Sequence, residues 1–402
     1  MKICLISNLY KPLIIGGAEI YVENIAKALS EKNEVLIITS VPFKGFKSLR
    51  PDVEQQDNIK IYKFSPANIY HTYFAKKKTN FIKPIWHMID VWNPHSYFVI
   101  RRILKKENPE IVHTHNLGGI SSSALYAAKS CGIPVVHTLH DCSLVCPRAT
   151  LIHEGSRTIC DNPAILCRMY RELKKRSTDK VDVITCPSDY VLNTFNQADF
   201  FPSSQKRIMI PLGLNMSLNP KKPFKDTLDL LYIGGIAKHK GIDVLIKAFK
   251  GIPTENIRLH IAGTGPYIDE VKMIADDPRI TLHGFVSGER KDDLFSLADV
   301  CIFPSLGYES FGLVIIESFF HGVPVVGSRT GSIPELIKEG HNGLLFEAGN
   351  SIELRNIIQR LISRPDELKR LSEGAIDSAK DYTIQGHINK LCDLYESLIA
   401  AN

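Results

Sequence analysis

Apolar residues in the first half of the chain form short, nearly continuous runs. These runs are rich in Val and Ile and cover residues 2–8, 34–40, 59–65, 110–116, 133–140 and 181–188. Most are separated by stretches of helical periodicity, such as 17–32, whose apolar positions include Ile20, Ile25, Ala28 and Leu29. Continuous β-branched runs separated by helices are typical of parallel strands that are buried on both faces. The pattern therefore predicts an α/β fold.

The same alternation starts again after residue 226. The runs of this second series cover residues 229–235, 257–263, 280–286, 299–305, 324–328 and 343–346. A Lys- and Pro-rich loop at 218–226 separates the two series. We therefore predict two α/β domains of similar design, residues 1–212 and 213–383, with a hinge near 212–226.

Composition narrows the class of protein. The 402 residues, 44% hydrophobic and 23% charged, are ordinary for a globular protein of two or three domains. The net charge of +6 is modest and favours anionic partners such as phosphates or a membrane surface over nucleic acid. Nine cysteines are too few for a disulfide framework, and neither a signal-peptide layout nor a long apolar run is present. We expect a cytoplasmic protein.

Two glutamates, Glu309 and Glu317, lie eight positions apart around an apolar run. A helix that starts near Phe311 would rise about 12 Å over eight residues, similar to the span from hexose to ribose in a nucleotide sugar. The alternative is a core helix whose glutamates reach solvent, but acids set in an apolar run have little room to do so and need partners. We predict that Glu309 binds sugar hydroxyls, that Glu317 binds the ribose, and that the helix N-terminus binds the diphosphate.

Two glycine-rich segments follow predicted strands. The sequence GGAE, with Gly16 and Gly17, lets backbone N–H groups approach a phosphate, although a plain turn explains it equally well. In GGIAKHKG at 234–241, Lys238 and Lys240 stand at a helix start, where cations are unfavourable unless an anion is bound; solvated lysines are the alternative. Neither segment is the GxGxxG fingerprint, which lowers the odds of a dinucleotide cofactor.

A histidine, His140, ends the run 133–140, and His113 and His115 end the preceding run. Ligands bind at the carboxyl ends of strands in open α/β sheets. We interpret His140 as a hydrogen-bonding group near the reacting bond, with a satisfied structural histidine as the alternative. No HExxH spacing supports a metal.

Two further residue sets have alternative readings. Cys142, Cys146, Cys160 and Cys167 lack a CxxC pair, which favours buried thiols over a zinc site. Basic and aromatic residues form two clusters, which favour either an anionic membrane surface or solvated helix faces. The clusters consist of Lys76, Lys77, Lys78, Trp86, Trp92, Arg101, Arg102, Lys105 and Lys106, and of Arg168, Arg171, Lys174, Lys175 and Arg176.

Taken together, the motifs resemble those of the retaining glycosyltransferases of family four. The resemblance is in the EX7E pair Glu309 and Glu317, the GGAE segment, the pair Lys240-Gly241, and His140. It covers nearly the whole chain, with motifs from residue 16 to residue 317. The segment HDCSLVCPR at 140–148 resembles the polysaccharide- and lipopolysaccharide-type subset of that family.

The resemblance implies a GT-B fold, in which two Rossmann-like domains face a central cleft. Residues 1–212 would bind the acceptor, residues 213–383 would bind the donor, and the helix at 384–402 would pack back on the first domain. The implied reaction transfers a hexose from a UDP- or GDP-sugar to a glycan or lipid-linked acceptor, with retention. Retention can proceed by front-face attack or through a covalent intermediate, and we favour front-face attack because the sequence shows no evident nucleophile on the correct face. No metal or cofactor is expected. The expected location is cytoplasmic, with peripheral contact to an anionic membrane and no nucleic acid.

The resemblance also assigns residue roles. Glu309 matches the acid on the donor sugar, Lys240 the lysine on the diphosphate, and His140 the histidine near the anomeric centre; these three form the predicted catalytic set. The predicted donor-binding set is Gly16, Gly17, Lys238, Gly263, Val286, Ser310, Phe311, Gly312, Leu313 and Glu317.

The chain departs from the family pattern at two positions. Gly235 stands where the family often has an arginine on the phosphates, so Lys238 or His239 would have to supply that charge. Tyr170 stands where the polysaccharide subset often has a cysteine. Rival readings are a UDP-sugar epimerase of the same fold and a non-catalytic nucleotide-sugar-binding subunit. A dehydrogenase is disfavoured by the absent fingerprint.

Overall fold

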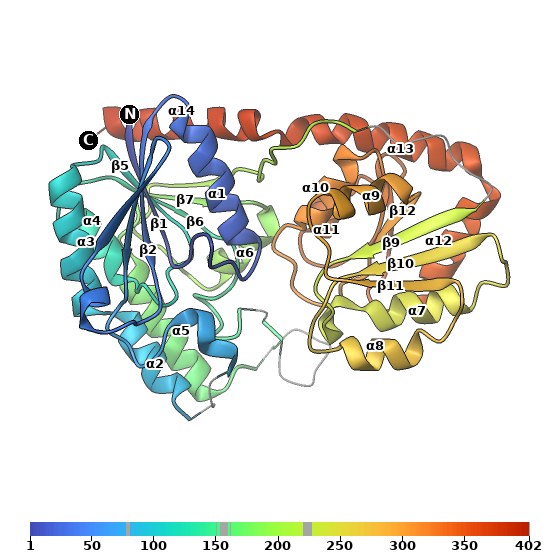
Figure 1. The fold of residues 1–402 in the computed structure, drawn as a ribbon, viewed down its shortest axis with the longest axis horizontal. Coiled ribbons are helices and arrows are strands. Elements are labelled where there is room, and N and C mark those ends of the chain that lie inside the picture. Colours follow the sequence, from blue (N-terminus) through green and yellow to red (C-terminus); the bar gives the residue numbers. More distant parts are fainter. Residues whose placement is uncertain (78–80, 150, 153–159, 161, 220–226, 402) are drawn as a thin grey trace. The chain divides into compact units, whose positions relative to one another are not determined.

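The computed structural model describes residues 1–77, 81–149, 151–152, 160, 162–219 and 227–401. The chain divides into two compact units (Figure 1). Unit 1 comprises Met1–Thr150, Asn162–Gly213 and Ile384–Asn402, and unit 2 comprises Leu151–Asp161 and Leu214–Thr383. The sequence analysis placed all residues before 213 in the first domain, whereas Leu151–Asp161 groups with unit 2. Residues 220–226 of the predicted hinge lie outside the described residues.

Unit 1 is built on an eight-stranded sheet with the order β3-β4-β2-β1-β5-β6-β7-β8. Its strands are β1 (Lys2–Ser7), β2 (Glu34–Ser40), β3 (Asp52–Gln56), β4 (Ile59–Phe64), β5 (Ile111–Thr114), β6 (Val135–Thr138), β7 (Val183–Cys186) and β8 (Lys206–Met209). All neighbours pair in parallel except β3 and β4. The antiparallel edge strand β3 was not predicted, because its sequence DVEQQ is polar and largely exposed.

Helices cover the sheet of unit 1. They are α1 (Gly17–Ser30), α2 (Lys83–Val91), α3 (Pro94–Glu107), α4 (Ser123–Lys129), α5 (Ile165–Thr178), α6 (Asp189–Gln197) and α14 (Ile384–Ala400). The C-terminal helix α14 packs on α1 (Figure 1). Helix α1 buries Tyr21, Val22, Ile25, Ala26 and Leu29, whereas Ile20, counted among its apolar positions, is exposed. No helix in the described part of the chain combines the length and apolar character needed to cross a membrane.

Unit 2 contains a six-stranded sheet with the order β11-β10-β9-β12-β13-β14, parallel throughout. Its strands are β9 (Leu228–Ile233), β10 (Ile257–Ala262), β11 (Ile280–Gly284), β12 (Val300–Phe303), β13 (Val325–Ser328) and β14 (Gly343–Phe346). Its helices are α7 (Ile242–Lys250), α8 (Ile268–Ile274), α9 (Glu289–Leu297), α10 (Leu313–Phe320), α11 (Ile333–Leu336), α12 (Ser351–Ser363) and α13 (Pro365–Ala379). The predicted α/β class is confirmed in both units.

The strand orders identify one topological switch point in each sheet. In unit 1 the chain runs from β1 to one side of the sheet and returns with β5 on the other side of β1. In unit 2 it leaves β9 through β10 and β11 and returns with β12 beside β9. Loops diverge at such points and leave room beyond the carboxyl ends of the strands, where ligands bind in open α/β sheets.

Candidate functional site

Two predicted catalytic residues meet at the switch point of unit 2. Lys240 lies in a short 3₁₀ helix, Lys238–Lys240, after β9, and Glu309 lies in the loop after β12. The ammonium of Lys240 donates to Glu309 Oε2 at 2.6 Å. The side chains retain 26% and 14% exposure respectively, so the pair is partly buried but reachable from solvent. Separated by 69 positions in sequence, the two residues are brought together only because β9 and β12 are neighbours.

Backbone contacts hold the two loops in this arrangement. The Leu306 N–H donates to the His239 carbonyl at 2.8 Å. Gly241 adopts a φ of +67°, and a Cβ at that position would lie 1.9 Å from the Pro304 carbonyl oxygen. Only glycine therefore fits, which is the physical reason for the Lys-Gly pair. The Glu309 carbonyl in turn accepts from the Ser332 N–H at 3.0 Å, which fixes the loop on the side of β13.

The helix between the two glutamates starts later than predicted. Helix α10 begins at Leu313 behind the N-cap Gly312, whereas a start near Phe311 was expected. Gly312 has a φ of +91°, which turns the chain into the helix, so Ser310 and Phe311 remain in the preceding loop. Phe311 is buried and packs edge-on against Tyr382. The first N–H groups of α10, at Leu313 and Val314, have no partner inside the helix.

Glu317 lies in α10 and has a lysine partner that the sequence analysis missed. Its Oε1 accepts from the Lys291 ammonium, in α9, at 2.5 Å, and its side chain is only 16% exposed. The second oxygen, Oε2, is buried and accepts no hydrogen bond from the described groups. The expectation that a buried acid needs partners is therefore met for one oxygen only. No local spacing signals Lys291, because it lies on another helix.

The other predicted donor residues of unit 2 lie at the same edge of the sheet. Gly263 follows β10, and a Cβ there would lie 1.8 Å from the Gly234 carbonyl, so the loops after β9 and β10 touch through their backbones. Val286 is buried after β11, and Lys238 is exposed. Gly235, where the family pattern has arginine, is surrounded by open space, since no atom lies within 4 Å of a Cβ built there.

Tyr232, in β9, is a further site residue that sequence reasoning did not single out. Its hydroxyl donates to the Gly235 carbonyl at 2.8 Å and so shapes the glycine loop. Burial, together with the nearby charge of Glu309, raises the pKa of Tyr232, which stays protonated and keeps donating.

At the switch point of unit 1, backbone N–H groups of the glycine loop after β1 donate hydrogen bonds to Glu19, the glutamate of the GGAE segment. Glu19 Oε2 accepts from the Gly16 N–H at 2.7 Å and from the Ile15 N–H at 3.2 Å, and Gly17 begins α1. Burial raises the pKa of Glu19 despite these bonds. The Gly16 N–H group, which was predicted to approach a phosphate, therefore donates to a carboxylate oxygen of the chain itself.

The histidines predicted at the neighbouring strand ends form one buried cluster. His113 lies in β5, His115 follows it, and His140 follows β6. His115 Nδ1 and His140 Nε2 are 3.1 Å apart, so one ring donates to the other. Burial lowers the pKa of His140 to about 3 and that of the other two well below the usual range. All three rings are therefore neutral near pH 7.

Residues from distant parts of the chain complete this cluster. His387 Nδ1 donates to the Pro211 carbonyl at 2.8 Å, so its Nε2 accepts from the Tyr21 hydroxyl, also at 2.8 Å. Tyr395 contacts His113 Nδ1 at 2.5 Å, and Tyr21 packs edge-on against His140. His387 and Tyr395 lie in α14, far in sequence from the histidines they support. In the described residues, no group of three His, Cys, Asp or Glu side chains is placed to hold a metal ion.

Two sequence interpretations need correction. Cys142 is buried, but Cys146, Cys160 and Cys167 are only partly buried, so the prediction of buried thiols is right for one of the four. Lys174, assigned to a basic surface cluster, is buried and paired with Asp90 at 2.7 Å.

Trp86, from the other cluster, is also buried, whereas Trp92 is exposed. The side chains of Lys76 and Lys77, and all of Lys78, lie outside the described part of the chain.

Comparison with known proteins gives matches over most of the chain. A family model described as "Glycosyltransferase Family 4" matches residues 15–218, and one described as "Glycosyl transferases group 1" matches residues 217–378. The chain is 30% identical, over 337 residues, to an uncharacterised 42.6 kDa protein in the cps region of Klebsiella pneumoniae. That alignment covers 84% of this chain and 87% of the relative.

Solved structures are similar over the full length. Sucrose-phosphate synthase from Thermosynechococcus elongatus matches with a TM-score of 0.76 at 21% identity, covering 100% of both chains. HepE from Anabaena, in complex with UDP, matches with a TM-score of 0.71 at 18% identity, covering 99% of this chain and 100% of that one. These similarities show that the fold of this chain is GT-B, as predicted.

Proposed function

The chain belongs to glycosyltransferase family 4, and from this premise we propose that it transfers a hexose from a UDP- or GDP-sugar to a glycan or lipid-linked acceptor. We further propose that the transfer retains the anomeric configuration and serves cell-surface polysaccharide synthesis. The observation that carries the proposal is the Lys240–Glu309 pair at the switch point of unit 2. Support for the donor comes from the UDP in the HepE structure, and support for the pathway from the cps region of the Klebsiella relative.

The donor would exchange partners with this ion pair. A diphosphate carries more charge than a carboxylate and forms charge-assisted bonds to lysine, so it would draw the Lys240 ammonium away from Glu309. Glu309 would then accept hydrogen bonds from sugar hydroxyls instead. The N-terminus of α10 adds N–H groups and the positive end of a helix dipole beside the same diphosphate. Glu317 Oε2, which is buried and has no hydrogen-bond partner among the described residues, is suited to accept from a ribose hydroxyl.

Departure of the nucleoside diphosphate leaves negative charge that must be stabilised. We assign this task to Lys240 and the α10 N-terminus, and we expect no metal to be required. Each preorganised donor of this kind is worth about 3–4 kcal/mol of barrier when removed. We favour attack from the front face over a covalent intermediate, because Glu309, once released from Lys240, would accept hydrogen bonds from hydroxyls of the donor sugar and would thereby be a poorer nucleophile.

His140 would act as a neutral hydrogen-bonding group. Because its pKa lies at about 3, it is not an imidazolium near pH 7 and brings no positive charge to the reacting sugar. One of its nitrogens is engaged by His115, and the other is left to orient a hydroxyl of the donor sugar.

A donor screen tests the proposal directly. We expect UDP- or GDP-sugars to raise the melting temperature of the full chain, since a ligand at 100 times its Kd adds about 2.7 kcal/mol. Transfer to glycan acceptors should then follow with the stabilising donor, and the product should keep the donor's anomeric configuration. Conversion of the donor alone into another nucleotide sugar would instead identify an epimerase. Donor binding without transfer to any acceptor would identify a binding subunit.

A further inference from the structure

Helices α2 and α5 of unit 1 turn large apolar side chains outward. In α2 these are at positions 85 and 88, which are neighbours on one helical face, and exposed apolar residues at 81 and 92 flank the helix at its two ends. On α5 they are at 165, 166, 169 and 173. We call this set the docking face: Phe81, Ile85, Met88, Trp92, Ile165, Leu166, Met169 and Leu173, each between 42% and 92% exposed.

Of the residues that the two helices bury, only Trp86 is apolar, and the others are Asp90, Lys174, Ser177 and Thr178. Asp90 in α2 and Lys174 in α5 form an ion pair at 2.7 Å, with both side chains 2% exposed, and Asp90 also accepts from the Gly119 N–H. The two helices pack against each other, as Figure 1 shows. Surface helices normally bury their apolar stripe, and a buried ion pair contributes little net stability. The outward placement of apolar residues is therefore not explained by the folding of unit 1 and indicates a partner.

Charge identifies the kind of partner. Apart from the buried pair, residues 81–92 and 165–176 contain one acid, Glu172, against several cations. These cations are Lys83, Arg168, Arg171, Lys175 and Arg176. In a two-fold dimer the face would meet itself and oppose cation to cation. A bilayer with anionic headgroups accepts both the apolar side chains and the surrounding positive charge.

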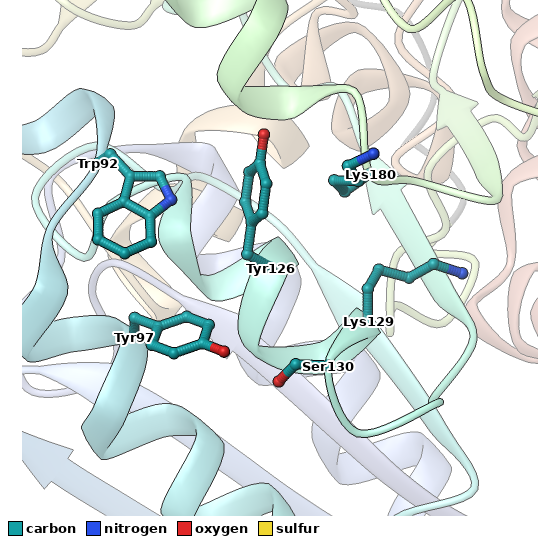
Figure 2. Close-up of a pocket in the computed structure, with 6 residues that line it drawn as sticks. All are labelled: Trp92, Tyr97, Tyr126, Lys129, Ser130 and Lys180. Carbon is teal, nitrogen blue, oxygen red and sulfur yellow. The ribbon is translucent and has the colours of Figure 1, made fainter.

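An aromatic groove lies beyond the C-terminal end of α2, where the docking face ends at Trp92. It has a volume of about 610 Å³ and is lined by Trp92, Tyr97, Tyr126, Lys129, Ser130 and Lys180. Figure 2 shows Trp92 and Tyr97 on one side of the groove and both lysines on the other. Lys129 is paired with Asp182, whereas Lys180 is exposed. Trp and Tyr beside lysines are typical of residues at the level of lipid headgroups.

We propose that the docking face inserts its apolar side chains into an anionic bilayer, with Trp92 at headgroup level. The inference goes beyond the proposed transfer reaction and does not depend on it. Such binding would bring the chain, which has no membrane-spanning helix in its described part, to the lipid-linked acceptor of the proposed function.

Vesicle binding by the full chain tests the proposal. We expect co-sedimentation with vesicles of phosphatidylcholine and phosphatidylglycerol, weaker binding to phosphatidylcholine alone, and weakening by salt. The chain has two tryptophans, of which Trp86 is buried, so a blue shift of the emission on binding reports Trp92. Trp92→Phe should remove that shift. Absence of wild-type binding to the anionic vesicles would overturn the proposal.

A matched pair of substitutions locates the contact. Met88→Gln combined with Met169→Gln should lower the partition constant by about a hundredfold, at about tenfold for each methionine withdrawn from the bilayer. Met273→Gln in α8 is the control, because Met273 is 71% exposed and Met88 is 69% exposed. Equal binding by the double variant and the control would refute the assignment. The assignment would also be refuted if the wild type formed a dimer in the absence of vesicles and the double variant did not.

Stabilisation by UDP, measured on the same proteins, separates the two proposals. The double variant should bind UDP as the wild type does. Loss of vesicle binding with intact UDP stabilisation and transfer leaves the transfer reaction standing. Vesicle binding without any donor response or transfer would support the docking face and refute the proposed function.

Discussion

The two switch points share a strand arrangement but differ in electrostatics. Between β9 and β12, unit 2 presents a lysine and a glutamate that form a partly exposed ion pair. Between β1 and β5, unit 1 presents histidines that burial keeps neutral. The comparison teaches that topology decides where in each sheet the site lies, whereas the residues on the loops decide whether the site suits a charged or an uncharged ligand. A charged diphosphate suits the first site, and an uncharged sugar hydroxyl suits the second.

We call the Lys240–Glu309 pair at the switch point of unit 2 the charged site. Removal of its cation should have the largest effect on the transfer rate. For Lys240→Ala we expect kcat to fall about 100- to 1000-fold, because a preorganised donor to the leaving diphosphate is lost. Steady-state transfer with the preferred donor measures this. Lys238→Ala is the control, since Lys238 is an exposed cation two positions earlier in the same loop. Equal losses in the two variants would show that Lys240 provides only general positive charge.

The buried histidine cluster at the switch point of unit 1, which we call the neutral site, should make the stability of the protein sensitive to acid. The pKa values of His140 and His387, and of the buried His137 in β6, are lowered to about 3, 4 and 4 respectively. Between about pH 6.5 and pH 4 the unfolded chain therefore binds protons that the folded chain does not. The free energy of unfolding therefore falls as pH falls through this window, by at most about 1.4 kcal/mol per pH unit for each histidine.

Both tryptophans lie in unit 1, so denaturant titrations followed by their fluorescence report this unit. His387→Gln should make the pH dependence shallower by about one proton. A free energy of unfolding that stays constant from pH 7 to about pH 5 would contradict the neutral assignment of the cluster.

The open space at Gly235 allows a substitution that should strengthen UDP binding at the charged site. Gly235→Arg restores the arginine of the family pattern without a steric clash, since nothing lies within 4 Å of a Cβ there. We expect Kd for UDP to fall about tenfold, because hydrogen bonds to charged groups contribute about 1.5–3 kcal/mol. Calorimetric titration measures the change, with Gly235→Ala as the control for the added Cβ. Weaker UDP binding by the arginine variant would place this loop away from the phosphates.

The smallest expected effect is on the free energy of unfolding, when a hydrogen bond that supports the histidine cluster is removed. Tyr395→Phe removes the hydroxyl that contacts His113 and should lower the free energy of unfolding by about 1 kcal/mol. It should leave UDP binding unchanged, because the hydrogen bond it removes is to His113 and not to Lys240, Glu309 or Glu317. Denaturant titration and UDP calorimetry on one preparation test both statements. A change in Kd for UDP would show that the two sites are not independent.

Much of the fold followed from local pattern. The predicted β-rich runs contain strands of the two sheets, because strands buried on both faces must be apolar at nearly every position. The family inferred from the ordered motifs is confirmed. Strand β3 was missed because an exposed edge strand needs no apolar pattern. The start of α10 was misplaced because the left-handed Gly312 ends the loop, and sequence does not report φ.

For the candidate site, the sequence named residues but not the partners that they have in the folded chain. Glu309, Lys240 and His140 were named from their positions after predicted strands. That Lys240 bonds Glu309, that Lys291 bonds Glu317, and that α14 supports the histidines all depend on contacts between distant segments. The buried position of Lys174 was likewise hidden, because its Asp90 partner is 84 positions away.

By itself, the sequence determined the strands, their α/β alternation and the residue types at the loop ends, since these depend on near neighbours and on the period of the backbone. Tertiary structure alone decided which charges are paired, which histidines are neutral and which faces of α2 and α5 are exposed. Ionisation and pairing depend on local solvation and on neighbours in space, and a linear pattern contains neither. For that reason the basic residues at 168–176 looked like one surface cluster, whereas folding buries Lys174 in an ion pair and leaves apolar residues outside.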